Sequence, residues 1–344
     1  MVKSSNPSSA SAPRLTYSAF FEQQISEDEK SYALMRIAVV HRSRMTAHAA
    51  QGLVKLRLPP RMNTAGFAVG DWVVVNSETG ELIRRLDRAT LLQRQTEGTH
   101  AKQLIAANVD TLFIVTSCND DFNHARLERY LALANEAGTT PVIVITKVDQ
   151  VADPTPYLQK AESLQRGLVA VALNAKSGDA IAALAPWCGE GQTVALVGSS
   201  GVGKSTLLNT LAEKTGEAAQ ATGGIRETDA KGRHTTTSRS LHTMASGGWL
   251  IDTPGMRTLH VSDIAHGLDV LFAEITELAP ECRFRDCTHA NEPGCAVLAA
   301  VADGTLEADR LERWRKLVEE NRDNTRVETG PRGNKIAKSR FKRR

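Results

Sequence analysis

A glycine-rich segment of the sequence has the pattern G-x-x-x-x-G-K-S, which is typical of loops that bind nucleotide phosphates. It follows the apolar run 193–197 and precedes a helical-looking stretch that begins at Thr206. The glycines allow backbone N–H groups to surround the phosphates, Lys204 would reach the β and γ oxygens, and the Ser205 hydroxyl would bind Mg²⁺. We call residues 198–205 the phosphate loop, and the predicted phosphate contacts are Gly198, Ser199, Ser200, Gly201, Val202, Gly203, Lys204, Ser205 and Thr206.

A second motif predicts which base is bound. Thr146, Lys147, Val148 and Asp149 directly follow the apolar run 141–145. The Asp149 carboxylate can accept two hydrogen bonds from guanine, adenine offers no such pair, and the Lys147 stem can cover the base. The usual first residue of this motif is Asn, so Thr146 keeps a hydroxyl but loses an amide, and we expect somewhat weaker guanine binding. A Lys-x-Asp sequence is also common on protein surfaces, so the motif needs support from its neighbours.

That support comes from a third motif, between the base-reading motif and the phosphate loop. The apolar run 169–173 leads into Asn174, Ala175 and Lys176. This resembles a Ser-Ala-Lys motif whose backbone N–H contacts the guanine O6, with Asn in place of Ser. The motif is weak evidence by itself, and its position between the other two motifs is the main reason to assign it to guanine binding.

Two segments after the phosphate loop are interpreted as nucleotide-sensing switches. Asp252, which opens the sequence Asp-Thr-Pro-Gly, would hold Mg²⁺ through water, and the Gly255 N–H would sense the γ-phosphate. We call 252–255 the second switch. The polar, glycine-rich stretch 223–237 is interpreted as the first switch, with Thr236 predicted to complete the Mg²⁺ shell. A plain solvated loop is the alternative interpretation of this stretch.

The residue that positions the attacking water is predicted to be His234. Many GTPases have a Gln after the second-switch Gly, but this chain has Met256, which cannot orient water. His234 lies in the first switch and can hydrogen-bond to water. The alternative is a His that only holds the switch closed, and in either case we expect slow intrinsic turnover until a partner orders the switch. Lys204, Thr236 and His234 are therefore the predicted catalytic residues.

These motifs indicate a circularly permuted GTPase, because the base-reading motif precedes the phosphate loop. We place this domain at residues 96–262. A strand at 111–115 and an amphipathic helix at 125–137 begin an alternation of strands and helices, which predicts a mostly parallel α/β sheet with both faces covered. The nucleotide should lie at the carboxyl ends of the strands.

The N-terminal part of the chain is predicted to carry a basic β-barrel. Residues 1–30 are rich in Ser, Ala and Pro and are predicted to be disordered. Short apolar runs separated by Gly- and Pro-bearing turns predict a small β-barrel at 31–95, and its basic residues are compatible with an oligonucleotide-binding (OB) fold, which the family resemblance given below also implies. A barrel that serves only as a lid or spacer remains the alternative. The barrel's basic residues suit nucleic acid: Arg36, Arg42, Arg44, Lys55, Arg57, Arg61, Arg84, Arg85 and Arg88.

Three cysteines and a histidine have the spacing C-x₄-C-x-H-x₅-C, at Cys282, Cys287, His289 and Cys295. Four such ligands make a closed tetrahedral zinc site with a structural role. Disulfides are the competing interpretation, and the odd cysteine count and the lack of a secretory signal argue against them. Cys118 and Cys188 are interpreted as small core residues.

The zinc-binding domain is placed at 263–328 and is predicted to be mostly helical. Leu311, Trp314, Leu317 and Val318 recur at helical spacing, which predicts an amphipathic helix docked on its neighbour. Residues 329–344 form a basic tail suited to phosphate backbones. The net charge of the whole chain is only +3, so this basicity is localised at the two ends. No apolar run is long enough to predict a membrane span.

The sequence closely resembles the bacterial ribosome small subunit-dependent GTPase A family over about residues 32–320. The resemblance rests on the basic barrel, the permuted motifs with Gly-Arg-His-Thr-Thr and Asp-Thr-Pro-Gly, and the Cys/His spacing. It implies GTP hydrolysis with Mg²⁺, one structural Zn²⁺, and stimulation by the small ribosomal subunit and its rRNA. It also implies a cytoplasmic role in late maturation of that subunit, followed by release. His234 matches the family's switch histidine, and we expect a monomer.

Two other functions stay open at this point. One is a GTPase that acts on another RNA, such as the large subunit or tRNA. The other is a non-catalytic RNA-binding switch that uses GTP only for affinity, which Met256 favours and His234 disfavours.

Overall fold

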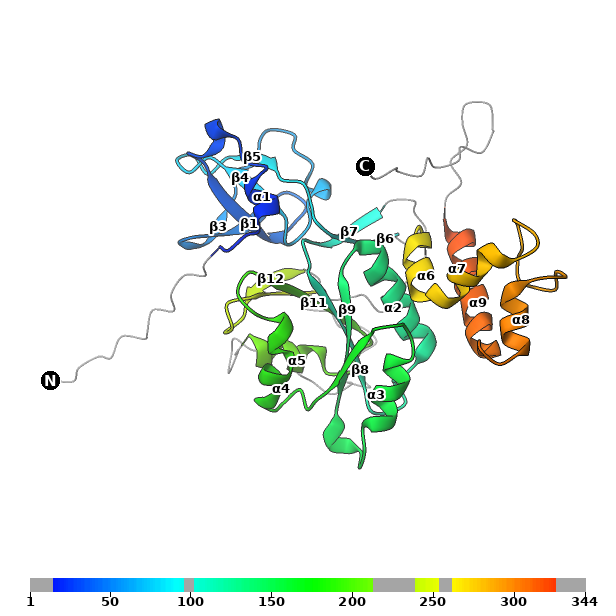
Figure 1. The fold of residues 1–344 in the computed structure, drawn as a ribbon. Coiled ribbons are helices and arrows are strands. Elements are labelled where there is room, and N and C mark those ends of the chain that lie inside the picture. The colour runs from blue at the N-terminus through cyan, green and yellow to red at the C-terminus, as the bar shows by residue number, and fades with distance from the viewer. Residues whose placement is uncertain (1–14, 96–101, 213–238, 254–261, 326–344) are drawn as a thin grey trace, which may run out of the picture.

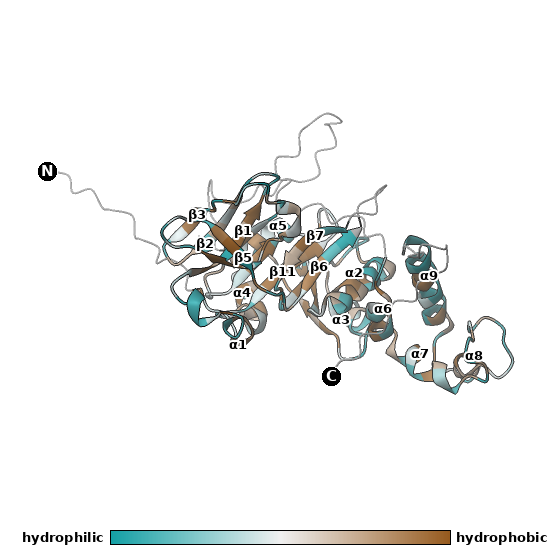
Figure 2. Cartoon of the chain, turned by 90° about the horizontal axis from the view of Figure 1, so that it is seen from above, coloured by the Kyte–Doolittle hydropathy of each residue, from teal (hydrophilic) through white to brown (hydrophobic). Residues whose placement is uncertain are grey.

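The computed structural model describes residues 15–95, 102–212, 239–253 and 262–325. A β domain, an α/β domain and a helical domain follow one another along an elongated molecule (Figures 1 and 2). The first switch and half of the second switch, residues 254 and 255, lie outside the described residues, and so do His234, Thr236, Gly255 and Met256.

The N-terminal domain is a five-stranded antiparallel sheet of strand order β3-β2-β1-β4-β5. Arg57, just after β3, pairs with Glu81, just before β5, so the two edges of the sheet are joined by backbone hydrogen bonds. Side chains such as Ile37, Met45 and Val73 fill its interior. The strands are β1 (Ala33–Val40), β2 (Met45–Ala49), β3 (Gly52–Lys55), β4 (Trp72–Val75) and β5 (Leu82–Arg85), with the 3₁₀ helix η2 (Thr64–Gly66) between β3 and β4.

The prediction of disorder up to residue 30 was wrong for residues 15–30. This segment forms α1 (Ala19–Glu22) and the 3₁₀ helix η1 (Glu27–Glu29). Phe21 is buried, with its ring 5.8 Å from that of Trp72. The Arg84 guanidinium donates to both oxygens of Glu29, at 2.6 and 2.7 Å. An apolar anchor and an ion pair therefore hold a segment whose average composition suggests disorder.

The central domain contains a six-stranded sheet of order β10-β9-β8-β11-β13-β12. Every neighbouring pair is parallel except β12 with β13, which confirms the predicted mostly parallel sheet. The phosphate-loop strand β11 is central, between β8 and β13. The strands are β8 (Thr111–Ser117), β9 (Thr140–Thr146), β10 (Val169–Ala172), β11 (Thr193–Gly198), β12 (Ser240–Thr243) and β13 (Trp249–Asp252).

Helices cover both faces of this sheet because successive strand residues point to opposite sides. Leu112 and Ile114 of β8 share one core with α2 (His124–Ala137) and α3 (Thr155–Glu162). Phe113 and Val115 share the other core with α4 (Asp179–Leu184) and α5 (Lys204–Leu211). The connections also contain the 3₁₀ helices η3 (Val148–Gln150) and η4 (Ala185–Trp187).

A two-stranded sheet lies between the barrel and the central sheet. It pairs β6 (Leu91–Gln95) with β7 (Lys102–Ala107) in antiparallel register. The domain boundary predicted between residues 95 and 96 falls between these paired strands. The apolar periodicity that begins at residue 111 gave no sign of this pairing.

The C-terminal domain is helical, and its first helix, α6, packs against α2 of the central domain (Figure 1). Leu311 and Leu317 are buried, so the helix predicted from their spacing is confirmed. The helices are α6 (Ala265–Leu271), α7 (Ala273–Leu278), the 3₁₀ helix η6 (Ala279–Glu281), α8 (Ala296–Ala302) and α9 (Ala308–Asn324). Within the described ranges, no helix has the length and apolarity needed to cross a membrane.

Candidate nucleotide site and metal centre

The phosphate loop connects the end of β11 to the start of α5, and its glycines are required by its path. Gly198 has φ 141°, and a Cβ there would lie 2.2 Å from the Val115 carbonyl oxygen of the neighbouring strand. Gly203 has φ 96° at the start of α5. The loop therefore presents its backbone N–H groups at a helix N-terminus, where the helix dipole favours anions.

The predicted guanine motifs converge on the same edge of the sheet. β9 ends at Thr146, β11 ends at Gly198, and the parallel strand β10 ends just before Asn174. Because the carboxyl ends of parallel strands meet at one edge, these motifs are brought together there. The Thr210 hydroxyl of α5 donates to the Ala175 carbonyl at 2.7 Å, which ties the third motif to the helix after the phosphate loop.

Thr146 is fully buried and holds the phosphate loop. Its hydroxyl lies 2.6 Å from the Val202 carbonyl oxygen and 3.1 Å from that of Thr116. A hydroxyl has one proton, and the shorter distance favours Val202 as its acceptor. The Asn expected at this position would offer an amide donor, so the Thr keeps the link to the loop with a shorter side chain.

The residues predicted to read the base lie in two turns after β9 and β10. Lys147 has φ 61°, in the left-handed region, which turns the chain into η3 and leaves Asp149 exposed. The Asn174 side-chain oxygen accepts from the Lys176 N–H at 3.0 Å, which shapes the third motif into a tight turn. Asp149 and these two turns therefore lie at the same edge of the sheet as the phosphate loop.

The residues predicted to bind Mg²⁺ in the described part of the chain lie on β13 and α5. Asp252 ends β13, opposite Leu196 of β11, and the buried Thr253 hydroxyl donates to the Leu196 carbonyl. Ser205 lies in the first turn of α5. The two predicted Mg²⁺ contacts of this region therefore follow adjacent, hydrogen-bonded strands. Oxygen ligands of this kind suit Mg²⁺.

An arginine that the sequence analysis did not single out contacts the phosphate loop. The Arg126 guanidinium of α2 donates to the Ser199 hydroxyl, and the Lys204 ammonium donates to the Ser199 carbonyl. Arg126 lies 73 residues from Ser199 in the chain, and no sequence pattern pointed to it.

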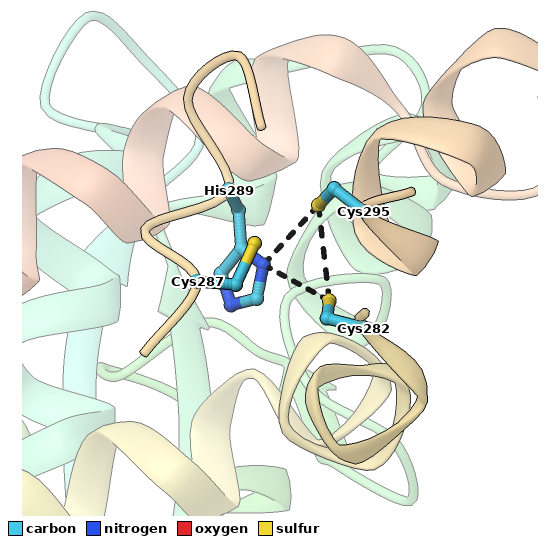
Figure 3. Close-up of side chains that lie close together, drawn as sticks. All are labelled: Cys282, Cys287, His289 and Cys295. Atoms are coloured by element: carbon cyan, nitrogen blue, oxygen red, sulfur yellow. Dashed lines mark hydrogen bonds between the residues drawn. The ribbon is translucent and has the colours of Figure 1, made fainter. Parts of the chain in front are cut away.

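The four predicted zinc ligands form a compact cluster (Figure 3). The ligand atoms of Cys282, Cys287, His289 and Cys295 all lie within 4.8 Å of one another. His289 Nδ1 is 3.5 Å from Cys282 Sγ and 3.4 Å from Cys295 Sγ, and these two sulfurs are 3.8 Å apart. Tetrahedral Zn–S bonds of about 2.3 Å place sulfurs roughly 3.8 Å apart, so the donor set is compatible with zinc. A disulfide would need about 2.05 Å.

Residues around the cluster shape its ligand loop. The Glu292 carboxylate accepts from the backbone N–H groups of Thr288, Ala290 and Asn291 at 2.8, 2.9 and 3.1 Å. Its hydrogen bond with the Thr288 side chain and these backbone bonds hold the pKa of Glu292 well below its usual range. Arg315 of α9 donates to the carbonyl of His289. Helix α9 is thus joined to the ligand loop by a hydrogen bond as well as by the packing of Trp314 on His289.

The remaining cysteines are buried, as their interpretation as core residues requires. Cys118 and Cys188 are 3% and 2% exposed. Burial raises the pKa of the Cys188 thiol to about 12. Neither thiol has the lowered pKa of a reactive cysteine.

Comparison with known proteins identifies the family. The model of the family described as RsgA GTPase matches residues 85–262. The chain belongs to the RsgA GTPase family. It is accordingly a GTP hydrolase, and its motif order is that of a circularly permuted GTPase.

Relatives in this family match nearly the whole chain. A protein of Mesorhizobium japonicum named "Small ribosomal subunit biogenesis GTPase RsgA" is 58% identical over 100% of this chain and 99% of its own length. A Vibrio vulnificus protein named "Small ribosomal subunit biogenesis GTPase RsgA 2" is 48% identical over 89% of this chain and 87% of its own.

Solved structures agree in fold. YjeQ from Thermotoga maritima matches with a TM-score of 0.62 and 27% identity, over 84% of this chain and 98% of that protein. YloQ, titled "a circularly permuted GTPase", matches with a TM-score of 0.61 and 26% identity, over 87% of this chain and 98% of that protein.

Proposed function

We propose that this GTPase acts in the biogenesis of the small ribosomal subunit, where the subunit stimulates GTP hydrolysis and hydrolysis to GDP and phosphate releases the protein. The observation that carries this proposal is the 58% identity, over the full chain, to a relative named for that role. The family also makes the bacterial cytoplasm, where ribosomes mature, the proposed location, with the monomer as the working form.

We assign the nucleotide contacts from the converging motifs. The phosphate loop with Thr206 would bind the phosphates, Lys204 would neutralise charge that develops on them, and Ser205 with Asp252 would hold Mg²⁺. Asp149 and Lys147, with the turn at 174–176, would read guanine. Three roles proposed here fall on residues outside the described ranges: Thr236 as a Mg²⁺ ligand, Gly255 as the γ-phosphate sensor and His234 as the water-positioning group.

We assign rRNA binding to the barrel, proposed to be an OB fold at about 31–95, with help from the basic tail at 329–344. Support comes from the joined edges of the five-stranded sheet and from its exposed cations. Arg36 does not belong to this surface because it is only 2% exposed. Arg84 and Arg88 are engaged by Glu29 and Asp71. The exposed basic residues that remain are Arg42, Arg44, Lys55, Arg57 and Arg61.

We propose Zn²⁺ as the metal of the Cys/His cluster, in a domain at about 263–328. Three thiolates and one imidazole leave no open coordination position, so the bound ion would stabilise the fold and take no part in hydrolysis. The spacing of the donor atoms, 3.4–3.8 Å for the measured pairs, supports this assignment.

The test is steady-state GTP hydrolysis by the purified full chain, alone and with isolated small or large subunits, with ATP as the nucleotide control. We expect strong stimulation by the small subunit only. The Lys204→Ala variant should have no turnover in any mixture. Stimulation by the large subunit alone, or equal rates in all mixtures, would contradict the proposed partner. Turnover retained by Lys204→Ala would contradict the site.

A further inference from the structure

The helix α2 contacts the phosphate loop with one face. Arg126 donates to the Ser199 hydroxyl, and the hydroxyl of Tyr130, four residues later, accepts from the backbone N–H of Gly198. Residues four apart lie on the same side of a helix. Tyr130 is 1% exposed, and burial raises its pKa to about 12, so its hydroxyl stays neutral at this contact. Two side chains of α2 therefore hold the beginning of the phosphate loop.

The same helix holds the C-terminal domain through Glu128. This carboxylate is fully buried, and its Oε1 accepts from the Arg310 and Arg313 guanidinium groups of α9, each at 2.9 Å. Its Oε2 has no hydrogen-bond partner among the described residues. Arg310 also donates to Glu274 at 2.7 Å, and its guanidinium lies 4.1 Å from the centre of the Phe272 ring.

The unequal use of the two Glu128 oxygens leaves room for a second arrangement. A buried acceptor without a partner costs about 1–3 kcal/mol. An arginine engages a carboxylate best with two parallel N–H bonds. A docking position of α9 in which Arg310 or Arg313 reached both oxygens would satisfy this acceptor.

α2 is held on both sides of these contacts. Its N-terminus is capped by the Asn123 side chain, which accepts from the Arg126 N–H at 3.0 Å. A Cβ on Gly267 of α6 would lie 2.0 Å from the Ala132 carbonyl oxygen, so the two helices touch backbone to backbone. The Glu136 carboxylate accepts from the Gly267 N–H at 2.9 Å. Because Glu128 and Arg126 are two residues apart in the same helix, a displacement of α2 at Glu128 would also move Arg126.

We propose that Arg126 is a positioning residue for GTP hydrolysis, and that α2 makes its hold on the phosphate loop depend on the docking of α9 at Glu128. Arg126 acts through Ser199 and is not assigned a contact with the nucleotide. It fixes the loop whose N–H groups must point at the phosphates in the transition state. Such geometry affects turnover more than binding, because misplacement by about 1 Å can cost roughly 100-fold in rate.

The first test uses intrinsic hydrolysis by the full chain without ribosomal subunits, so it does not depend on the proposed partner. Arg126→Ala and Ser199→Ala should each lower kcat about tenfold, while the affinity for a fluorescent GTP analogue changes less than threefold. The double variant should be no slower than Arg126→Ala, because both remove the same contact. Arg126→Lys, which keeps a cationic donor, should recover part of the rate.

The second test addresses the link through α2. Glu128→Gln keeps the shape of the side chain and removes its charge, and it should lower kcat in the same direction without touching the nucleotide site. The matched control is Arg166→Ala, which breaks an exposed ion pair between the same two domains, Arg166 with Glu277 at 2.8 Å, and should leave kcat unchanged. Zinc content and thermal unfolding verify that each variant is folded.

Three results would overturn the proposal. The first is a kcat within twofold of the parent for Arg126→Ala, and the second is full additivity of Arg126→Ala with Ser199→Ala. The third is a folded Glu128→Gln variant with unchanged kcat, which would remove the dependence on α9. If Lys204→Ala, measured in parallel, kept its turnover, the nucleotide-site assignment would fail instead.

Discussion

The two domains that flank the GTPase domain are attached to it by different chemistry. On the barrel side, Arg36 of β1 lies between the rings of Trp72 and Trp249, 5.2 and 5.5 Å from their centres. It donates to the Thr193 hydroxyl at 2.8 Å and to the Asn108 carbonyl at 3.1 Å. These hydrogen-bond partners are uncharged. Burial lowers the pKa of Arg36 to about 10, and the charges of Asp110 and Asp71 oppose that shift.

On the C-terminal side, buried and half-buried ion pairs add to the close packing of α6 on α2. Glu128 of α2 is bound by Arg310 and Arg313, and Arg129 pairs with Glu320 at 2.6 Å. The two interfaces therefore differ in their acceptors: the buried arginine on the barrel side donates to neutral groups, whereas Arg310 on the C-terminal side donates to carboxylates.

The attachments also differ in their distance from the nucleotide. Thr193 and Trp249 begin β11 and β13, so the barrel is fixed at the amino ends of strands whose carboxyl ends carry the phosphate loop and the second switch. α9 is fixed to a helix whose first turn contacts the phosphate loop. The C-terminal domain is therefore attached to a helix that itself contacts the phosphate loop, whereas the barrel is attached at the opposite end of the strands that carry the site.

Removal of the proposed zinc ion should have the largest effect, and this effect should be confined to the C-terminal domain. Structural zinc contributes on the order of 10 kcal/mol to small domains. Cys282→Ser, or a strong chelator, should unfold the helical domain while the barrel keeps its protease resistance and GTP still binds. Limited proteolysis with mass spectrometry measures this. Full protection of α8 and α9 in the presence of chelator would contradict a structural metal.

Gly267→Ala should separate the C-terminal domain from α2. The new Cβ would lie 2.0 Å from the Ala132 carbonyl oxygen, a backbone atom that cannot move aside alone. Overpacking of this kind costs about 3 kcal/mol. We expect a lower melting temperature by calorimetry and faster hydrogen exchange in α6. Gly66→Ala is a matched control, since a Cβ there meets nothing within 4 Å.

Arg36→Met should weaken the barrel interface by about 2 kcal/mol, because the Thr193 hydroxyl and the Asn108 carbonyl lose a buried donor. Denaturant unfolding measures the loss, which should be nearly independent of salt concentration. If the loss vanished in high salt, the interface would be ionic after all, and the contrast drawn between the two sides would fail.

The smallest effect is expected for Arg166→Ala. Both side chains of its ion pair with Glu277 are mostly exposed, 66% and 59%, and such pairs contribute less than about 0.5 kcal/mol. Unfolding curves of this variant should overlay those of the parent protein. A loss of more than about 1 kcal/mol in the free energy of unfolding would mean that this exposed ion pair, and not Glu128, holds the C-terminal domain.

The sequence predicted those features that depend on local patterns. Apolar runs that lead into Thr146, Gly198 and Asp252 placed the motifs at strand ends, and parallel topology then brings them together. The spacing of the cysteines and His289 predicted a four-ligand cluster because such sites are built from short loops. These predictions needed no knowledge of contacts between distant segments.

The features that were missed depend on distant contacts. Arg36 was grouped with the exposed cations of the barrel, and only the packing of Trp72 and Trp249 around it explains its burial. Glu128 and Arg310 are 182 residues apart, and each has an ordinary place in an amphipathic helix. The anchor at Phe21 was hidden in a Ser- and Ala-rich segment for the same reason.

The most direct test is hydrogen exchange of the full chain with and without a non-hydrolysable GTP analogue and Mg²⁺, followed in α2, α9 and barrel strands β1 and β4. The account predicts that the analogue changes exchange in α2 and α9 and leaves β1 and β4 as they were. Changes confined to β1 and β4, with α9 unaffected, would contradict it.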